Sequence, residues 1–212
     1  MIGNVPLRKI YMDILQPRRR TSIGTVAILV GVDSLTRFVM TVSLMNLSSE
    51  EVIRTILENI IFKYGIPIQI ITDRDSCFSG EEFEKFRKAL NIQHHLITAN
   101  HHQSNGMVER INITFNEAMR IFKNVEWDKT VLSTIFCYDN TIHLKTGFTL
   151  LCLIFGRNSN VKLIRRIFWL KVCILLRRRI GKNRFEEFNK NGMTCIKNHG
   201  KQKKNFYDFS LI

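Results

Sequence analysis

The stretch "TVAILVGVDSLTRFVMTVSL", residues 25–44, decides the fold. Its first part, residues 25–33, is a nearly continuous apolar run, which is typical of a strand buried on both faces. A second strand pattern, residues 37–44, follows after the short link "SLT". Because the run "LRKIYMDIL" at residues 7–15 is also β-rich, we expect these three segments to form an antiparallel meander.

Helix and strand signals alternate after the meander. Residues 48–65, "SSEEVIRTILENIIFKYG", begin with serines and acids, repeat apolar residues at helical spacing and end on Gly65, which predicts a helix. A strand at 68–73, a helix at 80–91, a strand at 92–98 and a further helix follow. The order βββαβαβα predicts an α/β fold with a mixed five-stranded sheet flanked by helices.

Length and charge divide the chain into two regions. Its 212 residues, 45% of them hydrophobic, suffice for one main domain. The formal net charge is +14, but residues 161–212 hold 14 basic and 3 acidic residues, a surplus of 11, which leaves +3 for residues 1–160. We therefore expect a core domain at 1–160 and a basic, partly disordered tail at 161–212. Such a tail either binds polyphosphate or directs nuclear import, or it only aids solubility.

Cysteine and histidine patterns favour neither a disulfide framework nor a zinc site. The five cysteines are scattered and form no CxxC pair. Since this pattern does not indicate a disulfide framework, we expect an intracellular protein. The four histidines in "QHHLITANHH", residues 93–102, have no cysteine pair nearby at ligand spacing. We expect His94 and His95 to face opposite sides of a strand. The most apolar run, residues 163–176, is too short and too charged to span a bilayer, so we expect no membrane role.

Two aspartates lie where a site is expected in an α/β sheet, at or near strand ends. Asp13 lies inside the first strand run, and Asp73 ends the fourth. A carboxylate in an apolar strand is costly to bury unless it is paired or binds a cation. Asp33 competes with them, but its place in "VGVDSLTRF" predicts a bond to the turn backbone instead.

A third acid, Glu109, belongs to the segment "HHQSNGMVERINITF" at residues 101–115. We expect "QSNG" to be a loop and Glu109 to lie in the first turn of the helix that follows. Helices favour acids near their N-termini, because the free N–H groups and the dipole stabilise negative charge there. Alternatively, Glu109 is a metal ligand whose partners lie far away in the sequence. The segment by itself leaves both interpretations open.

Five ordered segments resemble the catalytic core of retroviral and gypsy-type LTR-retrotransposon integrases. In that family's order, across roughly residues 5–158, they are "MDIL", "ILVGVDSLTRFV", "YGIPIQIITDRDSCF", "HHQSNGMVERIN" and "GFTLLCLIFGRN". The resemblance implies a ribonuclease H-like fold and a triad of Asp13, Asp73 and Glu109, with 35 residues between the last two. It also implies two Mg²⁺ or Mn²⁺ ions, with Asp13 bridging both, Asp73 holding one and Glu109 the other.

The region around Glu109 also supplies candidates for DNA contact. Gln103, Ser104 and Asn105 offer small polar side chains for phosphates or base edges, although Ser104 or Asn105 could cap the helix instead. Asn112 shares a helical face with Glu109 and is expected to point toward the substrate. Arg110 and Lys123 are candidates for phosphate contact. The apolar residues of this helix are expected in the core: Met107, Ile111, Phe115 and Met119.

Three departures from the family pattern bear on activity. Asp75 replaces the glycine that usually follows "TDR", so we expect a strained backbone and an additional acid near the metals. Asn100, His101 and His102 replace the usual Tyr-His-Pro, and "GFTLL" lacks the expected proline. The first change bears on the metal geometry, and all three bear on whether this copy is active.

The resemblance implies a DNA integrase-like polynucleotidyl transferase, derived from a retrotransposon, that carries out 3′-end processing and strand transfer. Its expected partners are element-end DNA, target DNA and further copies of itself, in the nucleus. The alternative is a domesticated or decayed core that binds nucleic acid without turnover. A weaker third option is a ribonuclease H-like nuclease that acts on hybrids or junctions, because a shared fold does not decide the substrate. The family's N-terminal zinc module is absent, so we expect a polyprotein fragment, a cellular descendant or a decaying copy.

Overall fold

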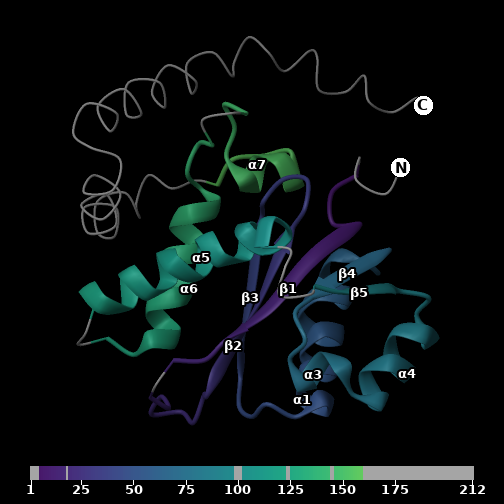
Figure 1. Ribbon diagram of the computed structural model, residues 1–212. Coiled ribbons are helices and arrows are strands. Elements are labelled where there is room, and N and C mark those ends of the chain that lie inside the picture. The colour runs from purple at the N-terminus through teal and green to yellow at the C-terminus, as the bar shows by residue number, and fades with distance from the viewer. Residues whose placement is uncertain (1–4, 18, 98–101, 123–124, 144–145, 160–212) are drawn as a thin grey trace, which may run out of the picture.

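A computed structural model describes residues 5–17, 19–97, 102–122, 125–143 and 146–159. Its centre is a five-stranded sheet with the strand order β3-β2-β1-β4-β5 (Figure 1). Strands β1 and β2 pair antiparallel, as do β2 and β3, whereas β1, β4 and β5 run parallel. The predicted mixed sheet and its meander are confirmed. The strands are β1 (Lys9–Leu15), β2 (Ala27–Asp33), β3 (Val39–Leu44), β4 (Gln69–Thr72) and β5 (Gln93–Leu96).

Strand β2 lies in the middle of the meander and is buried along its whole length, as its apolar run predicts. Asp33 at its end accepts a hydrogen bond from the Leu7 amide on Oδ1 at 2.8 Å. The other oxygen, Oδ2, accepts bonds from the Thr36 amide at 2.8 Å and from the Thr36 hydroxyl at 2.6 Å. The prediction that Asp33 bonds the turn backbone is confirmed.

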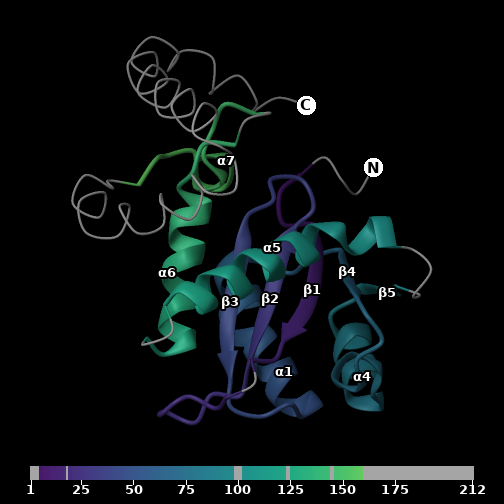
Figure 2. The ribbon, with the colours of Figure 1, turned by 60° about the vertical axis from the view of Figure 1, so that its left-hand side comes forward.

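Helices cover both faces of the sheet. Figure 2 shows α5 crossing one face, from the side of β4 and β5 toward β3, with α1 and α4 on the other face. The predicted helix at 48–65 consists of three consecutive segments and ends at Gly65, whose φ is 92°. The helical segments are α1 (Ser49–Ile56), the π-helical η2 (Leu57–Ile61), α2 (Phe62–Tyr64), α3 (Ser76–Ser79), α4 (Glu81–Ala89), α5 (His102–Ile121), α6 (Trp127–Asp139) and α7 (Leu150–Phe155).

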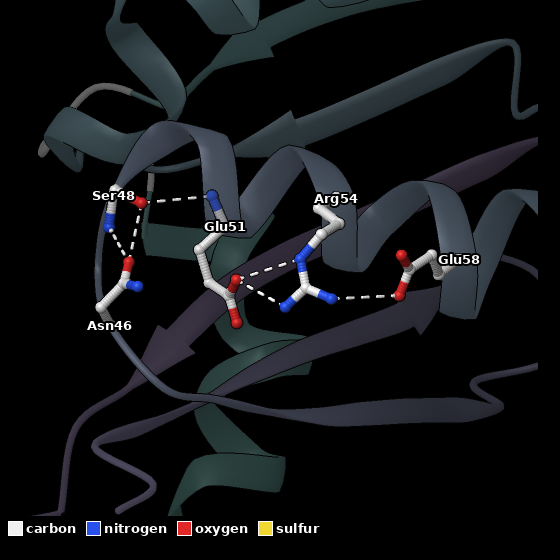
Figure 3. Close-up of polar contacts among 5 residues, drawn as sticks. All are labelled: Asn46, Ser48, Glu51, Arg54 and Glu58. Carbon is white, nitrogen blue, oxygen red and sulfur yellow. Dashed lines mark hydrogen bonds and ion pairs between the residues drawn. The ribbon is translucent and has the colours of Figure 1, made fainter.

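The start of α1 is fixed by side chains that satisfy its free N–H groups (Figure 3). Ser48 Oγ accepts a bond from the Glu51 amide at 3.2 Å. The Asn46 side-chain oxygen accepts bonds from the Ser48 amide and hydroxyl, at 2.9 and 2.7 Å. One turn further on, Arg54 bonds the carboxylates of Glu51 and Glu58 at 2.6 and 3.3 Å. This helix therefore begins where the serine and acid pattern predicts.

Alternation along the strands creates two apolar layers. Ile10 and Met12 face the layer that α1, η2 and α4 cover, whereas Tyr11 between them faces α5 and α6. Phe83 and Phe115 are among the largest fully buried side chains, one in each layer. Burial of a side chain of this kind stabilises the fold by about 1.5–3 kcal/mol. Since Asp13 has the same parity as Tyr11, it lies on the α5 side of β1.

Helices α6 and α7 have no counterpart in the order expected from sequence. Asp139 at the end of α6 is buried, and its Oδ1 accepts a bond from the Val39 amide at 3.2 Å. This bond joins α6 to the edge strand β3 across a large sequence separation. Among the described residues, no helix is long and apolar enough to cross a membrane.

Candidate active site

Asp13, inside β1, lies beside Asp73, which directly follows the parallel strand β4. Tyr11 of β1 pairs with Ile71 of β4, so the same register carried two residues further places Asp13 beside Asp73. Asp73 directly follows β4, at the sheet edge where α/β proteins commonly bind ligands. Sheet pairing thus brings together two acids that are separated by 60 positions in the sequence.

Asp13 is a half-buried carboxyl with two hydrogen-bond donors. Its Oδ1 accepts a bond from the Ile14 amide at 2.9 Å, and its Oδ2 accepts one from Asn112 Nδ2 at 2.8 Å. Burial and the negative charge of Asp73 raise the pKa of Asp13, and Asp75 adds a smaller contribution of the same sign. The two hydrogen bonds oppose this shift. The ionised form of Asp13 is therefore destabilised by burial and by the neighbouring acids.

Asn112 connects α5 to the strand that carries Asp13. Its amide nitrogen is used by Asp13, whereas its amide oxygen is buried and has no hydrogen-bond partner among the described residues. From its helical spacing, Asn112 is expected on the substrate side of the helix. The structure gives it a contact with Asp13 that sequence reasoning missed, because the two residues are 99 positions apart.

Glu109 lies further along its helix than the sequence suggested. Helix α5 begins at His102, and its first turn contains no acid, so the prediction that Glu109 lies in the first turn was wrong. The glycine and small polar residues of "QSNG" continue the helix, because the apolar repeat after them fixes the helical register and offsets their modest propensity cost. Glu109 is exposed and lies three residues before Asn112, on the same helical face.

The described part of the chain contains no group of three His, Cys, Asp or Glu side chains close enough to hold a metal ion. Asp13 and Asp73 are brought together, and Glu109 projects from the helix that contacts Asp13. The triad itself remains a prediction.

Asp75 does not strain the backbone, contrary to expectation. Its φ and ψ are −59° and 141°, a conformation open to any L-residue, because Asp75 is the N-cap of the short helix α3. Its Oδ1 accepts a bond from the Cys77 amide at 3.5 Å, and its own amide donates to Asp73 Oδ1 at 3.1 Å. The expected additional negative charge is present, since Asp75 contributes to the raised pKa of Asp13.

The remaining DNA-contact candidates divide by what the structure describes. Gln103, Ser104 and Asn105 belong to α5, so the loop predicted for them is a helix, while their side chains lie outside the described part. Lys123 lies outside the described residues, as do Asn100 and His101. Arg110 is exposed on α5. The predicted packing role is confirmed for the buried Ile111 and Phe115 and for the partly buried Met119.

The available donors suit a hard divalent cation. Mg²⁺ and Mn²⁺ prefer oxygen ligands, and Asp13 and Asp73 offer carboxylates at one strand edge. Burial is the main cause of the raised pKa of Asp13, and a cation between the two acids would offset both this cost and the repulsion from Asp73.

Most of the described chain is similar in sequence to proteins of known families. Residues 3–102 match the integrase core domain family. The chain is 28% identical over 156 residues to the retrovirus-related Pol polyprotein from transposon 412 of Drosophila melanogaster. This alignment covers 72% of this chain and 13% of the relative. It is 31% identical over 159 residues to the Pro-Pol polyprotein of feline foamy virus, covering 74% and 14%. The chain therefore spans about one seventh of the length of these relatives.

Solved structures share the fold at low sequence identity. The HTLV-2 integrase catalytic core domain, determined in complex with magnesium, superposes with a TM-score of 0.56 at 21% identity, covering 72% of this chain and 99% of that one. The BIV integrase catalytic core domain gives 0.57 at 16% identity, covering 71% and 95%. The ribonuclease H-like sheet, the paired aspartates and the sequence relatives agree: the matched residues form an integrase core domain related to those of retroviral and transposon Pol polyproteins.

Proposed function

We propose that this chain is a metal-dependent DNA integrase-like polynucleotidyl transferase that processes a DNA 3′ end and transfers it to a target strand. The observation that carries the proposal is the juxtaposition of Asp13, inside β1, with Asp73, which follows the adjacent parallel strand β4. The HTLV-2 integrase core, a protein of the same fold, was determined in complex with magnesium, which supports a divalent cation as the cofactor.

The reaction conserves the number of phosphodiester bonds in its second step. Processing adds water across a phosphodiester near the DNA end and leaves a 3′-hydroxyl. That hydroxyl then attacks a phosphorus atom of the target strand and displaces the target's 3′-oxygen. Two divalent ions, when bound, would supply positive charge beside both the attacking and the leaving oxygen.

Each residue then has a separate task. Asp13 and Asp73 would hold the cations, with Glu109 as the third carboxylate from α5. Asn112 fixes the orientation of the Asp13 carboxylate through its 2.8 Å bond, and this bond favours the ionised form that a cation requires. Arg110, exposed one residue after Glu109, would contact backbone phosphates, as would Gln103, Ser104, Asn105 and Lys123.

We also propose that the protein acts in the nucleus as a homo-oligomer on DNA. Solved HTLV-2 cores are described in dimeric and trimeric forms, and a chain with this fold belongs to the simian T-cell lymphotropic virus intasome. The surplus of 11 positive charges in residues 161–212 suits both DNA binding and nuclear import.

A second candidate is a core that binds nucleic acid without turnover. Asp75 favours it, because this acid adds negative charge beside Asp13 that the proposed cations must also balance. The two candidates share the fold and the basic composition of residues 161–212, and they differ only in turnover.

A strand-transfer assay separates them. Purified protein, oligonucleotide ends, target DNA and Mg²⁺ or Mn²⁺ should give joined products for the parent, whereas Glu109→Gln should give none while still binding DNA. Glu82→Gln, which removes an exposed glutamate from α4, is the matched control and should retain activity. DNA binding without joining by the parent would support the binding module, and cleavage confined to RNA–DNA hybrids would indicate a ribonuclease H-like nuclease instead.

A further inference from the structure

His94 lies on β5 and faces the end of β4, where it reaches the residue before Asp73. Its Nε2 is 2.9 Å from the Thr72 hydroxyl oxygen. Its ring packs edge-on against the fully buried Phe83 of α4, with the ring centroids 5.0 Å apart. His95, the next residue, is exposed. The two histidine side chains therefore face different environments, as strand geometry predicts, and the His94 side chain contacts Thr72, the last residue of β4 and the one before Asp73.

The Thr72 hydroxyl decides which atom of His94 carries the ring proton. Thr72 is fully buried, and its Oγ1 donates to the backbone carbonyl of Asp73 at 2.8 Å. A hydroxyl has one proton, so once that proton is donated the oxygen can only accept. The His94 contact is therefore a bond from Nε2–H to Thr72 Oγ1. Burial lowers the pKa of His94, which favours the neutral ring with this single proton.

These bonds form a chain of donors from β5 to the candidate active site. His94 donates to Thr72, and Thr72 donates to the carbonyl of Asp73. The peptide after Asp73 is thereby fixed at the point where β4 ends and regular ladder bonding stops. Fixing this peptide limits the directions in which the Asp73 carboxylate can point. Asp73 Oδ1 accepts a further bond from the Asp75 amide, so the acid is restrained from both sides.

We infer that His94 is a positioning residue of the candidate active site, which orients the Asp73 carboxylate through Thr72 without contacting substrate or metal. The inference rests on the proposed function for its catalytic meaning, but its structural content is independent of turnover. Partners of ligating residues commonly change metal affinity by tenfold or more when they are removed.

The test uses the full chain and three variants. His94→Leu removes the donor and keeps an apolar side chain against Phe83. His94→Gln keeps an N–H near the position of Nε2. His95→Leu is the matched control on the same strand, at an exposed position. NMR of labelled protein without metal reads the tautomer of His94 and the carbonyl carbon resonance of Asp73, and calorimetry reads the Mn²⁺ affinity.

The expected results are an Nε2-protonated His94 in the parent and an upfield shift of the Asp73 carbonyl carbon in His94→Leu. His94→Leu should also weaken Mn²⁺ binding about tenfold, whereas His94→Gln restores most of both values and His95→Leu alters neither. An Asp73 carbonyl resonance that is unchanged in a folded His94→Leu variant, or a parent ring protonated on Nδ1, would overturn the inference. Failure of the proposed function alone would appear as no strand transfer by the parent while these metal-free NMR differences persist.

Discussion

Asn112 Nδ2 donates a 2.8 Å hydrogen bond to Asp13 Oδ2 and so ties helix α5 to the middle of the sheet. The bond crosses from one layer of the fold to another, and it ends on the carboxyl whose pKa burial and Asp73 raise. Asn112 is therefore placed to control both the direction and the ionisation of Asp13.

Replacing Asn112 by leucine should raise the pKa of Asp13 further, because the hydrogen bond from Asn112 favours the ionised carboxylate. An NMR titration of the Asp13 side-chain carboxyl carbon would measure this shift. Strand transfer should fall by about tenfold or more, as is typical when a partner of a metal ligand is lost. Asn116→Leu, at an exposed position one turn further along α5, is the control and should leave both properties near the parent's values. An unchanged Asp13 titration in Asn112→Leu would contradict the proposed role.

Variants of Asp75 separate its charge from its capping role. Asp75→Ser keeps an N-cap oxygen for α3 but removes the charge, so the pKa of Asp13 should fall while stability changes little. Asp75→Gly removes the charge and the side-chain cap together, and should cost only a few tenths of a kcal/mol relative to a capped residue. Thermal unfolding and the Asp13 titration would check both expectations.

If the additional charge limits catalysis, Asp75→Ser and Asp75→Gly should both raise strand transfer in low Mg²⁺. Increased activity in the glycine variant alone would instead point to a backbone effect, which the ordinary φ of Asp75 argues against.

Asp139 predicts a pH dependence of stability. Burial raises its pKa to about 8 from the ordinary value of 3.8, so between these values the folded state holds a proton that the unfolded state has released. The contribution of Asp139 to the free energy of unfolding is therefore fully present below pH 4. It falls as the pH rises toward 8, by up to about 1.4 kcal/mol per pH unit.

Chemical denaturation at pH 5, 6 and 7 would measure this decline, and Asp139→Asn should flatten it, because the amide oxygen still accepts the Val39 bond and carries no charge. The raised pKa of Asp13 gives a slope of the same sign, so the comparison is between parent and variant. Equal slopes in the two proteins would show that Asp139 is ionised in the fold.

Deletion of residues 161–212 should reduce the salt dependence of DNA binding. The segment carries a surplus of 11 positive charges, and the logarithm of affinity changes by roughly 0.9 per released counterion for each tenfold change in salt. Fluorescence anisotropy at several salt concentrations gives the slope, with Glu109→Gln as a full-length control that should keep the parent's slope. A slope that survives the deletion would place the main phosphate contacts in the core instead.

The sequence by itself determined the sheet. Buried strands require apolar runs, so residues 7–15 and 25–44 were sufficient to predict β1, β2, β3 and their meander, and the capping serine with Gly65 marked the ends of the first helical region. The bond between Asp33 and the turn backbone was also readable, because its donor Thr36 is only three residues away in the sequence. Local patterns of this kind report on local structure and on burial.

Only the tertiary structure decided how the candidate site is built. The pairing of β1 with β4 brings Asp13 to Asp73, and the packing of α5 on the sheet brings Asn112 to Asp13, across separations that no local pattern records. The start of α5 at His102 and the ordinary backbone of Asp75 corrected expectations drawn from composition and from the family pattern, because packing and capping outweigh the preferences of single residues. The link from His94 through Thr72 to Asp73 likewise exists only because parallel pairing sets β5 beside β4.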